Sequence, residues 1–217
     1  MIPLKDINPT RSFPFVNVML ISANVLVFLY QITLSPPAQK AFMLANATIP
    51  ARIPAFLAGH APANVALFPL FSSMFLHGGL MHLLGNMLFL YILGDNVEDA
   101  FGHIGYLFFY LLCGIGSGLI HVLFNWGSGI PALGASGAIS GVMGAYAVMF
   151  PRHQILTFFF IFLIPVPAIL ILGYWFVLQF VAGINGLGMA TAGGVAWWAH
   201  IGGFLMGVVI AWATKKR

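Results

Sequence analysis

The sequence predicts an all-α protein embedded in a membrane, built as a bundle of six spanning helices. Of its 217 residues, 61% are hydrophobic and only 6% are charged, whereas a typical soluble domain carries about a quarter charged residues. Four acidic and eight basic side chains cannot cover a water-soluble surface, so most of this surface must face lipid. The apolar runs are long and continuous, unlike the short alternating segments of an outer-membrane barrel.

Six segments are candidates for the membrane helices, because a spanning helix needs about 20 mainly apolar residues. They are residues 15–34, 79–94, 101–124, 136–150, 154–182 and 194–213. The first lacks the short apolar core and cleavage site of a signal peptide, so we interpret it as a retained helix. The predicted parts are therefore a cytoplasmic N-terminal segment over 1–14, a membrane domain over 15–213 and a basic tail over 214–217.

Two of the regions are interrupted by proline. Residues 35–75 contain six prolines among Ala, Leu and Phe, which predicts a structured loop lying partly in the membrane interface. The fifth predicted helix carries Pro165 and Pro167. Either proline would break the local hydrogen-bond ladder, so we expect a kink there.

The distribution of basic residues predicts the orientation in the membrane. With both termini cytoplasmic, six bases lie inside and only Lys40 and Arg52 lie outside, as the positive-inside rule favours. Bases so scattered do not indicate a nucleic-acid partner. The minimal six-helix form predicts the cytoplasmic membrane of a prokaryote, with an organellar membrane as the alternative. The single cysteine, Cys113, says nothing about the compartment.

The fourth predicted helix is too short to cross the bilayer. Its 15 residues at about 1.5 Å each reach roughly 22 Å, against a hydrocarbon core of about 30 Å. If Arg152 marks the cytoplasmic interface, Ser136 starts this helix below the outer surface, and the Gly-rich loop before it dips into the protein. Irregular backbone at that depth must be buried in protein or line a wet cavity. The length therefore predicts a pocket with Ser136 at its floor.

Ser136 is the first candidate for chemistry. It stands at a helix start, where free backbone N–H groups and the helix dipole would suit a developing oxyanion. The alternative is an ordinary N-cap, a common role of such a serine. Gly137, Gly141 and Gly144 leave one face of the helix nearly bare, so it can approach a neighbouring backbone closely.

His200 is the second candidate, in the middle of the last helix. Small residues at helical spacing from it form a close-packing face: Ala196, Gly203, Gly207 and Ala211. The histidine therefore points at another helix, where an ionisable group is a functional hypothesis by default. Paired with Ser136 it would activate the hydroxyl as a nucleophile. The alternative is a neutral histidine bonded to a neighbouring hydroxyl.

His82 and Asn86 lie four residues apart and so share one helix face. Both can donate hydrogen bonds, which would stabilise an oxyanion, or they form a polar clamp between helices. Other candidates are weaker. His77 and His82 lack the zinc-site pattern, Asp95 lacks the second carboxylate of an aspartyl protease, and Cys113 lacks a base.

These residues occur in the order found in one known family. The motifs are His82-x-x-x-Asn86, then Glu98 with Phe101-Gly102, then Gly134-Ala135-Ser136-Gly137, then Ala199-His200-x-x-Gly203 with Gly207. Over residues 71–212 the chain resembles the rhomboid proteases. The resemblance implies a rhomboid-like bundle of six transmembrane helices with a short central fourth helix, which cleaves membrane-anchored substrates without a metal or cofactor.

The resemblance also implies roles for individual residues. Ser136 is the nucleophile and His200 its base, with no acidic third member. The backbone N–H of Ser136 and the side chains of His82 and Asn86 form the oxyanion hole. The fifth helix belongs to a lateral substrate gate. The expected partners are membrane-anchored protein substrates and the lipid bilayer, while the oligomeric state stays open.

The chain departs from the family at two places. Ser140 stands where many members carry an aromatic residue under the histidine ring, so Tyr146 or an aromatic of the fifth helix must support His200. The first loop lacks the family's Trp-Arg pair. Two other functions compete with proteolysis: a catalytically inactive relative that binds transmembrane clients, and a small transporter or channel. The transporter would need charged relay residues within the spans, and these are almost absent.

Overall fold

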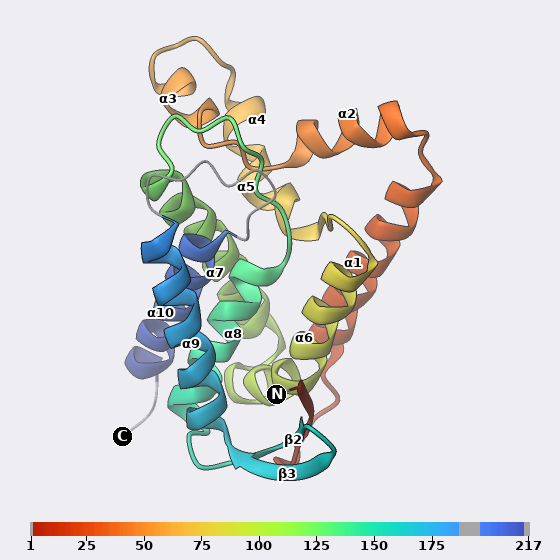
Figure 1. Cartoon of the computed structure of the whole chain (residues 1–217), viewed down its shortest axis with the longest axis vertical. Coiled ribbons are helices and arrows are strands. Elements are labelled where there is room, and N and C mark those ends of the chain that lie inside the picture. The colour runs from red at the N-terminus through yellow and green to blue at the C-terminus, as the bar shows by residue number, and fades with distance from the viewer. Residues whose placement is uncertain (1, 187–195, 215–217) are drawn as a thin grey trace.

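Five long apolar helices frame the molecule in a computed structural model that describes residues 2–186 and 196–214 (Figure 1). They are α1 (Phe15–Thr33), α6 (Leu80–Phe101), α7 (His103–Phe124), α9 (Ala168–Asn185) and α10 (Trp197–Thr214), each long and apolar enough to cross a membrane. Two shorter apolar helical segments accompany them among the described residues, Ala63–Phe75 and α8 (Ser136–Met149). The predicted membrane bundle with a short fourth helix is therefore confirmed. Residues 215–217 of the basic tail predicted over 214–217, and residues 194–195 at the start of the last predicted helix, lie outside the described residues.

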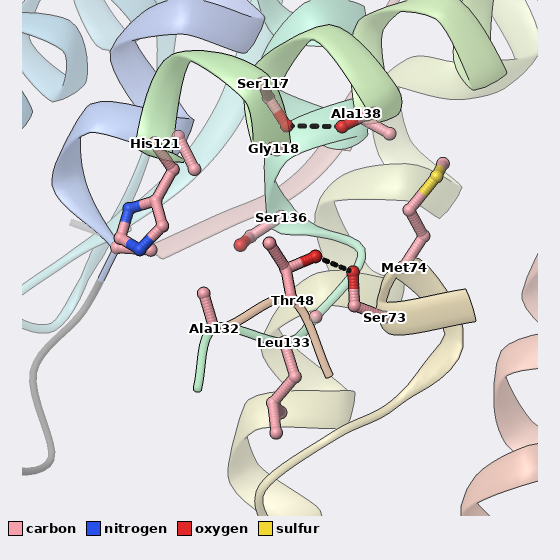
Figure 2. Close-up of a pocket in the computed structure, with 15 residues that line it drawn as sticks. Thr48, Ser73, Met74, Ser117, Gly118, His121, Ala132, Leu133, Ser136 and Ala138 are labelled. Carbon is pink, nitrogen blue, oxygen red and sulfur yellow. Dashed lines mark hydrogen bonds between the residues drawn. The ribbon is translucent and has the colours of Figure 1, made fainter. Parts of the chain in front are cut away.

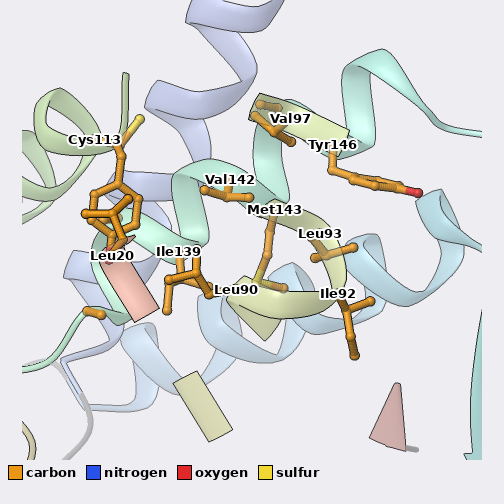
Figure 3. Close-up of a cluster of buried hydrophobic side chains, with 14 of the residues drawn as sticks. Leu20, Leu90, Ile92, Leu93, Val97, Cys113, Ile139, Val142, Met143 and Tyr146 are labelled. Atoms are coloured by element: carbon orange, nitrogen blue, oxygen red, sulfur yellow. The ribbon is translucent and has the colours of Figure 1, made fainter. Parts of the chain in front are cut away.

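Helix α8 stands in the centre of the bundle. It contacts α6, α7, α9 and α10, and every one of its residues over 137–147 is buried. Figure 3 shows Val142, Met143 and Tyr146 of α8 against Leu90 and Leu93 of α6. A helix that is apolar on all sides is buried by its neighbours, which fixes the position of its first residue, Ser136.

Glycines on both α8 and α10 let the two helices approach to backbone contact. A Cβ added to Gly203 would overlap the carbonyl oxygen of Gly137, and one added to Gly207 would overlap that of Gly141. The predicted partnership between the bare face of the fourth helix and the small face of the last one is thus observed. This contact carries Ser136 and His200 toward each other.

The segment between α1 and α6 is structured, as predicted. It contains α2 (Pro36–Asn46), α3 (Arg52–Leu57), α4 (Ala63–Ala66), α5 (Phe68–Ser72) and the 3₁₀ helix η1 (Ser73–Phe75). These lie at one end of the bundle (Figure 1). Thr48 and Ala132 bond to each other through both backbone groups, so this segment holds the loop that leads into α8.

The prediction of one helix over 154–182 is wrong in its first half. Residues there form a hairpin, β2 (Gln154–Phe159) and β3 (Phe162–Pro167), and β1 (Ile2–Asp6) pairs with β2 in an antiparallel sheet of order β1-β2-β3. Pro165 and Pro167 stand on the edge strand β3, where a missing N–H is tolerated. They therefore kink no helix, and α9 begins directly after Pro167.

The sheet is fixed to the end of the bundle opposite α2–α5 (Figure 1). Tyr146 of α8 donates a hydrogen bond of 2.8 Å from its hydroxyl to the carboxyl group of Asp6. Burial raises the pKa of Asp6, and the bond from Tyr146 partly opposes that rise. Nearby, the buried carboxylate of Glu98 accepts the backbone N–H groups of Val16 and Asn17 at 2.9 and 2.7 Å, which caps α1 from α6.

Candidate active site

Ser136 and His200 are hydrogen-bonded to each other. The Oγ atom of Ser136 lies 2.7 Å from Nε2 of His200. Ser136 is the first residue of α8, its neighbour Ala135 holds the N-cap position, and no side chain caps this helix. The N-cap alternative for Ser136 is therefore wrong. His200 is 8% exposed, whereas Ser136 is only half-buried.

The loop before α8 requires glycine at position 134. Gly134 has φ of +123°, a conformation that strains any residue with a Cβ. A Cβ there would also lie 2.8 Å from Nε2 of the His82 ring. The N–H of Gly134 bonds to the carbonyl of Ser73 at 2.9 Å. The loop is thus fixed to η1 and lies beside His82 of α6 immediately before Ser136.

His82 and Asn86 flank this loop from α6. Nδ1 of His82 accepts the N–H of Gly78 at 3.4 Å, so in the neutral ring the proton is on Nε2, which faces Gly134. The side-chain nitrogen of Asn86 is buried and has no hydrogen-bond partner in the described part of the chain. A buried, unsatisfied donor is costly, and a clamp between helices would have satisfied it. Two N–H donors therefore converge beside the start of α8.

A small cavity, lined by both polar and apolar residues, opens against Ser136. Its volume is about 30 Å³, measured as the space open to the centre of a water molecule, whereas one water needs roughly 10–15 Å³. Figure 2 shows Ser136 projecting between His121 and the pair Thr48–Ser73, whose hydroxyl groups bond at 2.9 Å. Ser117 of α7 also lines the cavity. The pocket predicted from the length of α8 is present.

The far side of the His200 ring is held by residues that the sequence did not single out. Nδ1 of His200 lies 2.7 Å from Oε1 of Gln179 on α9. The ring also lies against Trp175, with centroids 5.8 Å apart, and Trp197, at 6.4 Å. Support by an aromatic of the fifth helix is thus confirmed, whereas Tyr146 bonds to Asp6 instead.

Ser140 occupies the place beneath the pair without replacing an aromatic ring. Its hydroxyl donates to the carbonyl of Ser136 at 2.6 Å.

Gln179 could have been singled out from the sequence, because an amide side chain is unusual in an otherwise apolar spanning helix.

Within the described residues, no three His, Cys, Asp or Glu side chains are grouped so that they could hold a metal ion.

A family model and several relatives all point to the same protein family. The model of the rhomboid domain matches residues 64–217, more than half of the chain. Rhomboid protein 1, mitochondrial, of Saccharomyces cerevisiae is 33% identical over 151 residues, which cover 66% of this chain and 41% of that protein. RHOMBOID-like protein 1 of Arabidopsis thaliana is 34% identical over 148 residues, or 68% of this chain and 34% of the relative.

A third relative is Rhomboid-like protein 11, chloroplastic, of Arabidopsis thaliana, 31% identical over 162 residues, or 70% of this chain and 54% of the relative. The chain thus spans about a third to a half of the lengths of these relatives. The names of the first and third point to a mitochondrion and a chloroplast, so these relatives give no particular support to the predicted prokaryotic membrane. The matching domain and the several apolar spans lead to one conclusion: the chain is an integral membrane protein that belongs to the rhomboid family.

Proposed function

We propose that the protein is an intramembrane serine endopeptidase, which hydrolyses peptide bonds of membrane-anchored substrates with Ser136 and His200. The observation that carries the proposal is the 2.7 Å contact between Oγ of Ser136 and Nε2 of His200. A serine hydroxyl is a weak nucleophile until an adjacent base can take its proton. The contact supplies that base at hydrogen-bond distance.

The reaction follows from these positions in two halves. Oγ of Ser136 attacks the carbonyl carbon of the substrate while Nε2 of His200 takes the hydroxyl proton, and a tetrahedral oxyanion forms. His200 then passes the proton to the leaving amine, which leaves an acyl-enzyme on Ser136. In the second half, a water gives a proton to His200 and attacks the ester, and the acid product is released with the proton returned to Ser136.

The oxyanion would be bound at the start of α8. The N–H groups in the first turn of a helix have no partner within the helix, which leaves the N–H of Ser136 as a donor. The unpartnered amide nitrogen of Asn86 and the Nε2–H of His82 supply side-chain donors from α6. Donors that are fixed in place before the reaction stabilise the developing charge without reorganisation.

The water for hydrolysis would come from the cavity beside Ser136, which has room for at least one molecule. Its lining by Thr48, Ser73 and Ser117 offers the polar partners that a buried water needs.

We infer that the substrate is a membrane-anchored protein because Ser136 lies between spanning helices. With both termini cytoplasmic, the cavity end of the bundle faces away from the cytoplasm, and a prokaryotic cytoplasmic membrane remains the proposed location.

The alternative function is a catalytically inactive rhomboid-like protein that binds transmembrane clients. A chain of that kind need not keep a serine–histidine contact or an unpartnered donor beside it. Reaction with a fluorophosphonate distinguishes the two functions, because it needs an activated serine but no substrate. We expect the probe to label wild-type protein at Ser136, identified by mass spectrometry of the modified peptide, and to leave His200→Ala unlabelled. Absence of label on the folded wild-type protein would favour the client-binding function.

A further inference from the structure

Gln179 engages the one nitrogen of His200 that Ser136 does not. Its Oε1 lies 2.7 Å from Nδ1 of the ring. Gln179 lies on α9 and is only 8% exposed. We propose that Gln179 is a positioning residue of the proposed protease: its carbonyl oxygen accepts Nδ1–H and so holds His200 in the tautomer whose bare Nε2 faces Ser136. This inference rests on the proposed function.

The need for such a residue follows from the chemistry of imidazole. A neutral histidine carries one ring proton, on either nitrogen, and only the nitrogen without it can accept the serine proton. The hydrogen bond made by one nitrogen decides which state the other adopts. An acceptor at Nδ1 therefore selects the reactive state. When Nε2 takes the proton, the same carbonyl oxygen faces a positively charged N–H, and that bond strengthens.

The groups around His200 leave this task to Gln179. The aromatic rings of Trp175 and Trp197 lie beside the imidazole and offer no acceptor for Nδ1–H. The titratable groups that act on His200 are His82 of α6 and His121 of α7, and neither is a carboxylate. In the described part of the chain, the amide of Gln179 thus stands where serine proteases of the three-residue type place an acid.

The position of Gln179 also links the ring to the least buried spanning helix. In α9, 28% of the most apolar stretch is buried, against 33–50% in the other four long helices. Its contact with α10 runs through Trp175 and Phe176, which pack against Phe204. Since α9 carries the acceptor, the orientation of His200 depends on α9 remaining in this place.

Kinetics of two substitutions test the role. Gln179→Met removes the acceptor at nearly constant volume, and we expect kcat to fall about tenfold or more with KM within twofold of wild type. Gln179→Glu keeps an acceptor and adds a negative charge, so we expect kcat to be largely retained. The charge favours the protonated ring, so the acidic limb of the pH–rate profile should move to higher pH.

The matched control is Leu178→Met, the adjacent residue on the lipid-exposed side of α9 (46% exposed), which should leave kcat and the pH profile unchanged. A Gln179→Met enzyme with kcat within twofold of wild type would overturn the inference. So would a Gln179→Glu profile that coincides with that of wild type.

A spectroscopic readout decides the same point without any cleavage. In protein labelled with ¹⁵N-histidine, the signals of His200 are those lost in His200→Ala, and ring shifts distinguish Nδ1–H from Nε2–H. We expect Nδ1–H in wild type and a mixture of tautomers in Gln179→Met. If the amide of Gln179 instead donated its N–H to Nδ1, the ring proton of His200 would be on Nε2. Observation of Nε2–H in wild type would therefore overturn the inference. If wild type showed Nδ1–H but cleaved nothing, the proposed function would fail and the positioning by Gln179 would stand.

Discussion

Asn86 carries a buried donor that is costly for the fold and that we propose binds the oxyanion of the reaction. Its amide nitrogen is buried beside the start of α8 with no partner among the described residues. We predict that Asn86→Ala lowers kcat by about 10²–10³-fold, equivalent to about 2.7–4 kcal/mol, as loss of one oxyanion donor does. KM should change little, because the bond strengthens only in the transition state.

The kinetics of Asn86→Ala are to be compared with those of Asn46→Ala. Asn46 ends α2, and its side-chain amide donates a hydrogen bond to the carbonyl of Phe42 in the same helix. We expect this control to retain wild-type kcat. An Asn86→Ala enzyme that cleaved at the wild-type rate would show that the oxyanion is bound elsewhere.

His77 makes a prediction about pH and stability. The ring is 1% exposed, neither nitrogen has a partner in the described structure, and burial lowers its pKa from 6.5 to about 4. The unfolded chain therefore binds a proton as pH falls below about 6.5, whereas the native state resists it until about pH 4. This linkage should remove stability on the order of 3 kcal/mol across that window.

Replacement of the ring should suppress that loss. We predict that the midpoint of thermal unfolding in detergent falls less between pH 6.5 and pH 4 for His77→Phe than for wild type. The exposed His60 provides the control, since His60→Phe should follow the wild-type curve. Parallel curves for wild type and His77→Phe would mean that His77 does not cause the acid sensitivity.

The sequence allowed four residues of the candidate site to be chosen but not the fifth. Ser136, His200, His82 and Asn86 are polar groups on otherwise small or apolar faces, which makes them visible one by one. Gln179 is polar as well, yet its use depends on which way α9 faces, and that follows from packing between helices. Whether Ser136 caps its helix or bonds to His200 likewise depended on a contact 64 residues away.

Among the elements, the contact between α8 and α10 is the one whose failure would separate Ser136 from His200, the proposed catalytic pair. We predict that Gly207→Ala destabilises the protein by about 1–3 kcal/mol, because its Cβ would overlap the carbonyl oxygen of Gly141 and force the helices apart. Activity should fall as well, since small displacements of reacting groups are costly.

Gly173→Ala on α9 is the matched control for Gly207→Ala. Apart from its own helical turn and its chain neighbours, no atom of the described residues lies within 4 Å of the Cβ it would add, and alanine favours helices over glycine. Its unfolding midpoint in detergent should equal or slightly exceed that of wild type. If both substitutions lowered the midpoint equally, the loss would reflect glycine itself and not the close approach of α8 and α10.

Element boundaries could be predicted where the pattern was unambiguous. The starts of α1 and α8 were predicted at the observed residues, because an apolar run or a helix-start motif marks each. The hairpin of β2 and β3 was missed because a continuous apolar run fits a buried strand and a helix equally well. Here the prolines were the better guide, since Pro165 and Pro167 belong to an edge strand and to its end.

For the whole molecule, five helices long enough to span a membrane imply that the two ends of the bundle lie on opposite sides of it. The segment α2–α5 lies at one end and the sheet at the other (Figure 1). We predict that a membrane-impermeant maleimide labels Lys40→Cys in intact spheroplasts and labels Arg152→Cys only after the membrane is opened. Both positions are exposed, and the native Cys113 is fully buried, so wild type should remain unlabelled.

Labelling of both cysteines from the same side would contradict the arrangement of the spans. Labelling of Arg152→Cys alone in intact spheroplasts would reverse the orientation, with the cavity beside Ser136 then facing the cytoplasm. That second result would leave the fold intact and would overturn the orientation predicted from the basic residues.

The central claim is that Ser136 and His200 form a proteolytic pair, and one measurement tests it most directly. Wild-type protein, Ser136→Ala and His200→Ala are each reconstituted in liposomes with a single-span substrate, and the fragments are separated on a gel. We predict one new fragment with wild type and none with either variant, while all three proteins keep the same unfolding midpoint. Equal cleavage by wild type and Ser136→Ala, or no cleavage by wild type across several single-span substrates, would contradict the claim.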